Sequence, residues 1–236
     1  MNMNRNSDLT GKPGCASLKR EEALARLKET SDRKRGEESL ILRVDLSDMT
    51  MQDRNFKGLT FSVTSLVRAN MIRCDLQKAF IWQTDMCDAN FSQVDISHAL
   101  IYQTKMERIL MNGVSGESAS IIDCLGQGAT FSDFHQQGFS MVESRFRQCS
   151  FKGAILDQAL FRVCFLEKSE FREASLQGTW FWNCVLRGTD FSGADLRNAN
   201  FEDSDLTEAQ FQDADCRGVL ASAKQMEAIR KAGGLV

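Results

Sequence analysis

A five-residue period runs without interruption through most of the chain and determines what it can fold into. Every fifth residue from Leu46 to Phe211 is a centre of this pattern, and 31 of these 34 centres hold Leu, Ile, Met or Phe. Two residues before each centre the side chain is small, being Ala, Cys, Ser, Thr or Val at 28 of 34 positions. The period fits neither the 3.6 residues of an α-helix nor the alternation of a β-strand. It fits a coil with four short sides, each of which turns one large and one small residue inward.

The same stretch resembles the pentapeptide repeat family, whose consensus is a small residue, Asp or Asn, Leu or Phe, and two variable residues. Residues 194–196 (Ala-Asp-Leu) and 204–206 (Ser-Asp-Leu) match this consensus, as does Ala-Asn-Phe at 89–91 and 199–201. The resemblance implies an all-β solenoid, a right-handed quadrilateral β-helix with four repeats per coil. The 34 centres then give about 8–9 coils.

The limits of the repeat divide the chain into three predicted parts. Residues 1–43 are expected to be an N-terminal extension, partly disordered, with a short helix near 17–35. Residues 44–219 form the predicted β-helix, and residues 220–236 a C-terminal capping helix that blocks the unpaired edge of the last coil. In this helix Ser222 is the expected N-cap, Met226 and Ile229 face the last coil, and Gly233 is the stop signal.

The pattern weakens between about 112 and 140. Gly116, Gly126 and Gln136 occupy centres, whereas Phe134 and Phe139 stand where a small residue is expected. One hypothesis is that the two rings fill volume that the glycines leave empty, and so bend the rod or change its cross-section. The alternative interpretation is a bulge or a short loop without function.

One face of the predicted rod carries aromatic side chains on its outside. Residues twenty apart lie above one another when four repeats make a coil, and the outward positions of this face hold all three tryptophans and the only tyrosine. Exposed apolar area of this extent marks interfaces, and Trp and Tyr are frequent binding hot spots. The predicted interaction face consists of Phe80, Trp82, Leu100, Tyr102, Ile122, Phe165, Trp180, Trp182 and Val185. Its occupant is left open between residues 1–43 of the same chain, a second copy in a homodimer, and a different protein.

Charge is distributed unevenly along the chain. Residues 44–217 hold 24 acidic and 16 basic side chains, whereas residues 1–43 hold 7 acidic and 10 basic ones. In the last coils we expect an acidic patch in which Arg197 is the only basic side chain. Such a patch attracts a basic groove, although Asp before the centre also belongs to the repeat consensus. The patch consists of Asp190, Asp195, Glu202, Asp203, Asp205, Glu208, Asp213 and Asp215.

Several classes of function are disfavoured. Five cysteines (Cys74, Cys124, Cys149, Cys164 and Cys184) are separated by multiples of five and none forms a C-x2-C pair, so we expect buried thiols and no metal or cofactor. His98 and His135 are the only histidines, and neither a catalytic triad nor a nucleotide-binding loop is evident, so we expect no enzyme activity. An acidic rod disfavours direct binding of nucleic acid. With no apolar run of 18 residues and no signal-peptide core, we expect no membrane span and a cytoplasmic location.

The sequence therefore favours a non-enzymatic protein that binds a protein partner through the aromatic face. The resemblance implies that such a protein accompanies a bacterial secretion system, as an effector delivered without a cleaved signal peptide or as an accessory or adaptor protein. It also implies an alternative, a DNA mimic of the quinolone-resistance type that binds DNA gyrase or topoisomerase. A second alternative is a homo-oligomeric structural scaffold.

Overall fold

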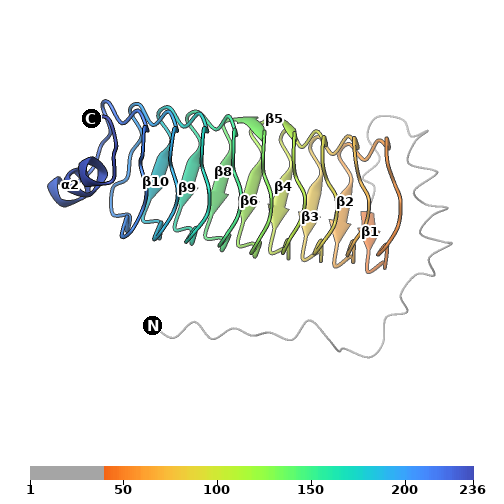
Figure 1. The fold of residues 1–236 in the computed structure, drawn as a ribbon. Helices are drawn as coiled ribbons and strands as arrows, with labels where there is room; N and C mark the ends of the chain where they lie inside the picture. Colours follow the sequence, from red (N-terminus) through yellow and green to blue (C-terminus); the bar gives the residue numbers. More distant parts are fainter. Residues whose placement is uncertain (1–39) are drawn as a thin grey trace, which may run out of the picture.

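The computed structural model describes residues 40–236, which form a rod of stacked coils (Figure 1). Eight strands of three residues lie side by side in one sheet, and all of their pairings are parallel. Consecutive strands of this sheet are twenty residues apart, so each of these coils contributes one strand. In chain order the strands are β1 (Leu40–Leu42), β2 (Thr60–Ser62), β3 (Phe80–Trp82), β4 (Leu100–Tyr102), β6 (Ser120–Ile122), β8 (Ser140–Val142), β9 (Leu160–Arg162) and β10 (Trp180–Trp182).

Backbone hydrogen bonds join each coil to its neighbours on every face. Outside the sheet, single parallel bridges repeat at the same spacing, as between Asp45 and Ser65 and between Thr50 and Asn70. The ladder of the sheet continues beyond β10 through bridges from Trp180 to Asn200 and from Asn200 to Leu220. The predicted quadrilateral β-helix is therefore confirmed, and each five-residue repeat forms one side of a coil.

The residue two positions after a centre turns the corner of the coil. At Ile96, for example, the turn closes through a hydrogen bond from the Ala99 amide to the Ile96 carbonyl of 2.8 Å, and His98 has a φ of 58°. This left-handed region costs an L-residue about 1–2 kcal/mol. The ladder bonds above and below offset that cost, since the His98 amide itself donates to the Glu117 carbonyl at 2.7 Å.

Phenylalanine rings fill the C-terminal half of the core. The rings of Phe151 and Phe171 stack with centroids 4.6 Å apart, and those of Phe161 and Phe181 with centroids 4.9 Å apart. The two columns meet edge to face, a geometry that stabilises aromatic pairs beyond their buried area. One column contains Phe131, Phe151, Phe171, Phe191 and Phe211, and the other Phe161, Phe181 and Phe201. Nearer the N-terminus, buried methionines occupy three positions of the first column, Met51, Met71 and Met111.

The irregular stretch keeps its register. A second, two-stranded sheet forms there from β5 (Ser115–Glu117) and β7 (His135–Gln137), whose residues pair at a spacing of twenty. No residue is inserted relative to the neighbouring coils, so the interpretation as a bulge or short loop is wrong. The pattern is irregular here because the chain forms a three-residue strand, β5, where other repeats form a tight turn. Gly116 in this strand has a φ of 139°.

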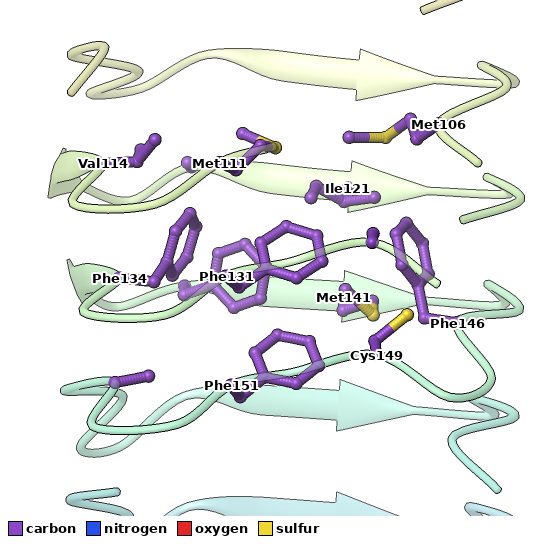
Figure 2. Close-up of a cluster of buried hydrophobic side chains, with 14 of the residues drawn as sticks. Met106, Met111, Val114, Ile121, Phe131, Phe134, Met141, Phe146, Cys149 and Phe151 are labelled. Atoms are coloured by element: carbon purple, nitrogen blue, oxygen red, sulfur yellow. The ribbon is translucent and has the colours of Figure 1, made fainter. Parts of the chain in front are cut away.

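Ring packing fills the volume that the small centres leave (Figure 2). Phe134 and Phe139 are fully buried with ring centroids 5.2 Å apart, which confirms that they point inward. The space at Gly126, however, is filled by Phe146: a Cβ placed on Gly126 would lie 2.7 Å from Cζ of this ring and closer still to its Cδ1 and Cε1. Gln136 also occupies a buried centre, and its amide atoms have no hydrogen-bond partner among residues 40–236.

Helix α2 (Ala223–Lys231) closes the C-terminal end of the rod (Figure 1). Its N-cap is Ser222, which exchanges hydrogen bonds with Gln225 in a capping box. The Gln225 side chain also donates to the carbonyl groups of Phe201 and Ser204 at 2.8 Å, and Ile229 is fully buried. The predicted capping helix is confirmed.

The start of the rod differs slightly from the predicted boundary at residue 44. Strand β1 pairs with β2, so Leu40–Leu42 already belong to the first coil. The rest of the predicted extension, including its helix near 17–35, lies outside the described residues. Within the described part of the chain, no helix has the length and apolar character needed to cross a bilayer.

Candidate interaction surface

The outward residues of the eight-stranded sheet form two columns along the rod. In each strand the middle residue points into the core, as Ile101 does, so its neighbours Leu100 and Tyr102 point outward. The columns lie about 7 Å apart, because two residues of a strand span this distance. The register brings all nine predicted residues onto this face or its adjoining corner, and we call this set the aromatic stripe: Phe80, Trp82, Leu100, Tyr102, Ile122, Phe165, Trp180, Trp182 and Val185.

The aromatic stripe has large side chains at both ends, and one of its columns has short side chains in the middle. At its C-terminal end Trp180 and Trp182 are 51% and 43% exposed. In the middle, β6 and β8 begin with Ser120 and Ser140, whose hydroxyl oxygens share a hydrogen bond of 2.8 Å. The other column keeps larger apolar side chains at this level, Ile122 and Val142.

Amide side chains border one edge of the stripe. The indole nitrogen of Trp82 donates to Oε1 of Gln103 at 3.3 Å, and the Gln83 amide donates to the same oxygen at 3.3 Å. The Gln103 amide in turn donates to Asp123 at 3.0 Å. These bonds hold the Trp82 ring in one orientation before any partner arrives, which reduces the entropy cost of binding.

Two arginines flank Phe165 at the corner of the stripe. The guanidinium carbons of Arg145 and Arg147 lie 5.2 Å and 5.8 Å from the ring centroid, within the range of cation–π contacts. Arg147 also forms an ion pair with Glu167 at 3.0 Å. Sequence reasoning missed this cationic edge, although the twenty-residue spacing places Arg145 directly between Leu125 and Phe165.

A further arginine interrupts one column of the stripe. Arg162 stands between Val142 and Trp182 in the ladder and bonds to Glu143 at 3.1 Å. Both side chains of this pair are largely exposed, so the pair contributes little to stability. The predicted face is thus apolar at both ends, with one neutralised charge between them.

The predicted acidic patch separates into two groups. Four of its aspartates precede a centre and pair with arginine: Asp190 with Arg172, Asp195 with Arg197, Asp205 with Arg187, and Asp215 with Arg217. The expectation that Arg197 is the only basic side chain in the patch is therefore wrong. The expectation failed because arginines of the preceding coil reach these aspartates from a neighbouring position. Arg172 and Arg187 each bond to an aspartate eighteen residues later, and not twenty.

Hydrogen bonds keep these paired carboxyl groups ionised. The Thr207 hydroxyl and the Arg187 guanidinium lower the pKa of Asp205 to about 2. Arg217 lowers the pKa of Asp215 to about 2 in the same way. The aspartates also accept backbone amides two residues later, as Asp205 does from Thr207 at 3.0 Å. The arginines therefore neutralise these aspartates, so the four pairs add little to the negative potential around the rod.

The second group of the acidic patch is exposed: Glu202, Asp203, Glu208 and Asp213. None of them forms an ion pair with another residue in the range 40–236. Asp203 and Glu208, together with Lys224, line an open pocket of about 440 Å³ between the last coil and α2. Within residues 40–236, only four of the eight carboxylates of the predicted acidic patch are therefore without an ion pair.

Elsewhere in residues 40–236, the two histidines lie apart. His98 contacts Glu117 at 3.3 Å, whereas His135 is exposed on another coil. Across residues 40–236, no group of three or more His, Cys, Asp or Glu side chains is placed to hold a metal ion. The five cysteines at multiples of five are buried as predicted, and burial raises the pKa of Cys124 and Cys149 to about 12. Cys124 and Cys149 are therefore protonated core residues.

The family model described as pentapeptide repeats (8 copies) matches the chain in four overlapping ranges, at residues 55–93, 69–108, 169–207 and 184–220. The matched ranges leave out residues 109–168, which include the irregular stretch. A comparison with curated protein sequences gives no match.

The chain is similar to solved structures of low sequence identity. Full-length QnrB1, a plasmid-mediated fluoroquinolone resistance protein, superimposes with a TM-score of 0.56 and 18% identity, over 83% of this chain and 98% of its own. HetL, a pentapeptide repeat protein involved in heterocyst differentiation regulation in the cyanobacterium Nostoc, gives a TM-score of 0.33 and 19% identity, over 85% of this chain and 91% of its own. At this identity the similarity to QnrB1 concerns the fold alone.

Proposed function

The chain belongs to the pentapeptide repeat family, and on this premise we propose that it is a non-enzymatic protein that binds a protein partner through the aromatic stripe. Proteins of this family are generally structural or interaction proteins. One observation carries the proposal: the three tryptophans and the single tyrosine of the chain all stand on the outside of one sheet face.

The exposed rings supply enough apolar area to drive binding. A tryptophan presents up to about 250 Å², so the exposed parts of Trp180 and Trp182, 51% and 43%, amount to roughly 235 Å² together. At about 25 cal/mol per Å², their burial contributes about 6 kcal/mol before the entropy of association is subtracted. Leaving such rings in water gives the fold nothing, since their strands are already held by the backbone ladder.

A pull-down with matched variants tests the proposal. Trp82→Glu combined with Trp182→Glu places two charges in the stripe and should abolish capture of the partner that the wild-type protein retains. The control is Leu110→Glu combined with Ile155→Glu. These two apolar residues lie outside the stripe and are 38% and 46% exposed. Loss in the control as well, or capture retained by the tryptophan variant, would place the binding surface elsewhere.

A gyrase-binding DNA mimic is the second candidate function. It is favoured by the four exposed carboxylates at the C-terminal end and by the shared fold with QnrB1, a fluoroquinolone resistance protein. The pairing of the other four aspartates with arginine weakens it. A DNA supercoiling assay with purified gyrase, with and without a fluoroquinolone, tests this function; neither inhibition nor protection by the protein would remove it.

Three finer predictions stay open to experiment. A homo-oligomeric scaffold requires that light scattering finds more than one copy per particle. A role beside a bacterial secretion system and a cytoplasmic location follow from the family resemblance and the N-terminal sequence. Fractionation of cells that produce the protein addresses both of these.

A further inference from the structure

We propose that the aromatic stripe binds a narrow, leucine-containing segment, and that the chain's own residues 17–39 are this segment and cover the stripe until the partner displaces them. The inference rests on the proposed function, because it takes the stripe to be a binding surface and names what occupies it. The shape of the face and the length of the chain both support it.

The stripe has the dimensions of one linear segment. Its two columns are about 7 Å apart, and β3 and β10 are separated by five coil spacings, or about 24 Å. At both edges the coil turns a corner, as at Gln103 after β4, so the side walls fall away from the face. A globular partner would overhang such a surface, whereas a single helix or extended segment lies along it.

The chain enters the rod on this same face. Leu40, the first described residue, begins β1, and its side chain is 50% exposed at the N-terminal end of the sheet. From β1 to the start of the stripe at β3 is two coils, about 10 Å. Residues 36–39 can span about 13 Å when extended. The sequence predicts a helix near 17–35, and nineteen helical residues measure about 28 Å, which matches the length of the stripe.

Side-chain size is complementary as well. Ser120 and Ser140 are the first residues of β6 and β8, so one column of the stripe has short side chains in its middle. In the segment, Leu24 and Leu27 are one helical turn apart, and Arg26 and Lys28 flank Leu27. The leucines suit the space above the short serine side chains.

Intrinsic fluorescence gives a direct readout, because the stripe contains all three tryptophans. The probe is acrylamide quenching of the full-length protein. Leu24→Glu combined with Leu27→Glu should uncover the stripe, shift the emission to longer wavelength and raise the quenching constant at least about twofold. Thr30→Glu combined with Ser31→Glu adds the same charge to the same segment but keeps both leucines, and should change the quenching much less. Equal effects of the two variants, or no effect of either, would overturn the proposal.

A photo-crosslinking residue in place of Leu24 supplies the second measurement. The expected products are bonds within one chain to the strands from β3 to β10. Bonds to other faces would overturn the proposal, and bonds between two chains would make a second copy the occupant. The outcome is separable from that of the proposed function. If quenching and crosslinks exclude the segment while the tryptophan variant still loses its partner, only the present inference fails; if the segment maps to the stripe and that variant keeps its partner, only the proposed function fails.

Discussion

The contact between Gly126 and Phe146 makes the packing of the irregular stretch testable by a double-mutant cycle. Gly126 lacks a positive φ, so alanine at this position meets no backbone strain. Its methyl group would instead fall on the Phe146 ring, 2.7 Å from Cζ, where carbon atoms normally stay about 3.5–4.0 Å apart. The substitution Gly126→Ala therefore isolates the cost of an overfilled core.

The magnitudes follow from the same geometry. Gly126→Ala should lower the free energy of unfolding by about 1–3 kcal/mol, as for other overpacked cores. Phe146→Leu removes ring contacts, including the one with Phe131 at 5.7 Å, and should cost about 1–2 kcal/mol. In the double variant the new methyl group occupies space that the ring has vacated. We therefore expect a favourable coupling of about 1–2 kcal/mol between the two substitutions.

Urea unfolding followed by far-UV circular dichroism measures the four corners of the cycle. The comparison holds when all variants unfold with the same dependence on urea concentration. Gly128→Ala is the control: it places alanine at a φ of 70°, where a side chain is strained, but the nearest side-chain atom belongs to Arg108, at 3.5 Å. It should be destabilising without coupling to Phe146. Additive costs within about 0.5 kcal/mol for Gly126→Ala and Phe146→Leu would refute the packing argument.

Three other predictions concern single side chains. Phe134→Ala removes a buried ring that packs 5.4 Å from Phe131 and should cost about 3–5 kcal/mol in urea unfolding; a loss below about 1 kcal/mol would contradict its place in the core. Ser222→Ala removes the N-cap acceptor of α2 and should cost about 1 kcal/mol, whereas Ser222→Asp should keep most of the stability in the same assay. The pKa of Asp205 is about 2 in the folded chain against 3.8 ordinarily, so its ionised form stabilises the fold above about pH 4 and this contribution is lost as the pH falls towards 2. Asp205→Asn should flatten that part of the stability–pH curve, and an unchanged curve would show that the carboxylate is not coupled to folding.

The coil architecture could be predicted from sequence because one backbone rule governs both the inside and the outside of the rod. The position in the five-residue repeat decides whether a side chain is buried, and the spacing of twenty decides its neighbours. The buried Phe134 and the column from Trp82 to Trp182 follow from these two numbers alone. The capping helix was equally readable, because Ser222 and Gln225 form a local motif.

The missed features depend on side-chain conformation. Phe146 fills the space at Gly126 from the next coil, and no rule of spacing gives the direction of its ring. The glycines at centres suggested a bulge or a short loop as one interpretation, but β5 and β7 pair there without an inserted residue. The arginine partners of Asp190 and Asp205 lie eighteen residues earlier, on a diagonal that a search by columns of twenty does not reach.

The distribution of phenylalanine along the rod gives its unfolding a direction. Stacked rings join successive coils from Phe131 to Phe211, whereas several coils nearer β1 are joined through flexible methionines such as Met71 and Met106. Rigid stacked rings lose less freedom on burial than methionine does, so cohesion between coils rises towards α2. The coils near β1 are therefore expected to unfold before the coils near α2. Trp82 lies on the less stable half of the rod and Trp182 on the more stable half. On heating, the part of the stripe around Trp82 would therefore release a partner before the part around Trp182.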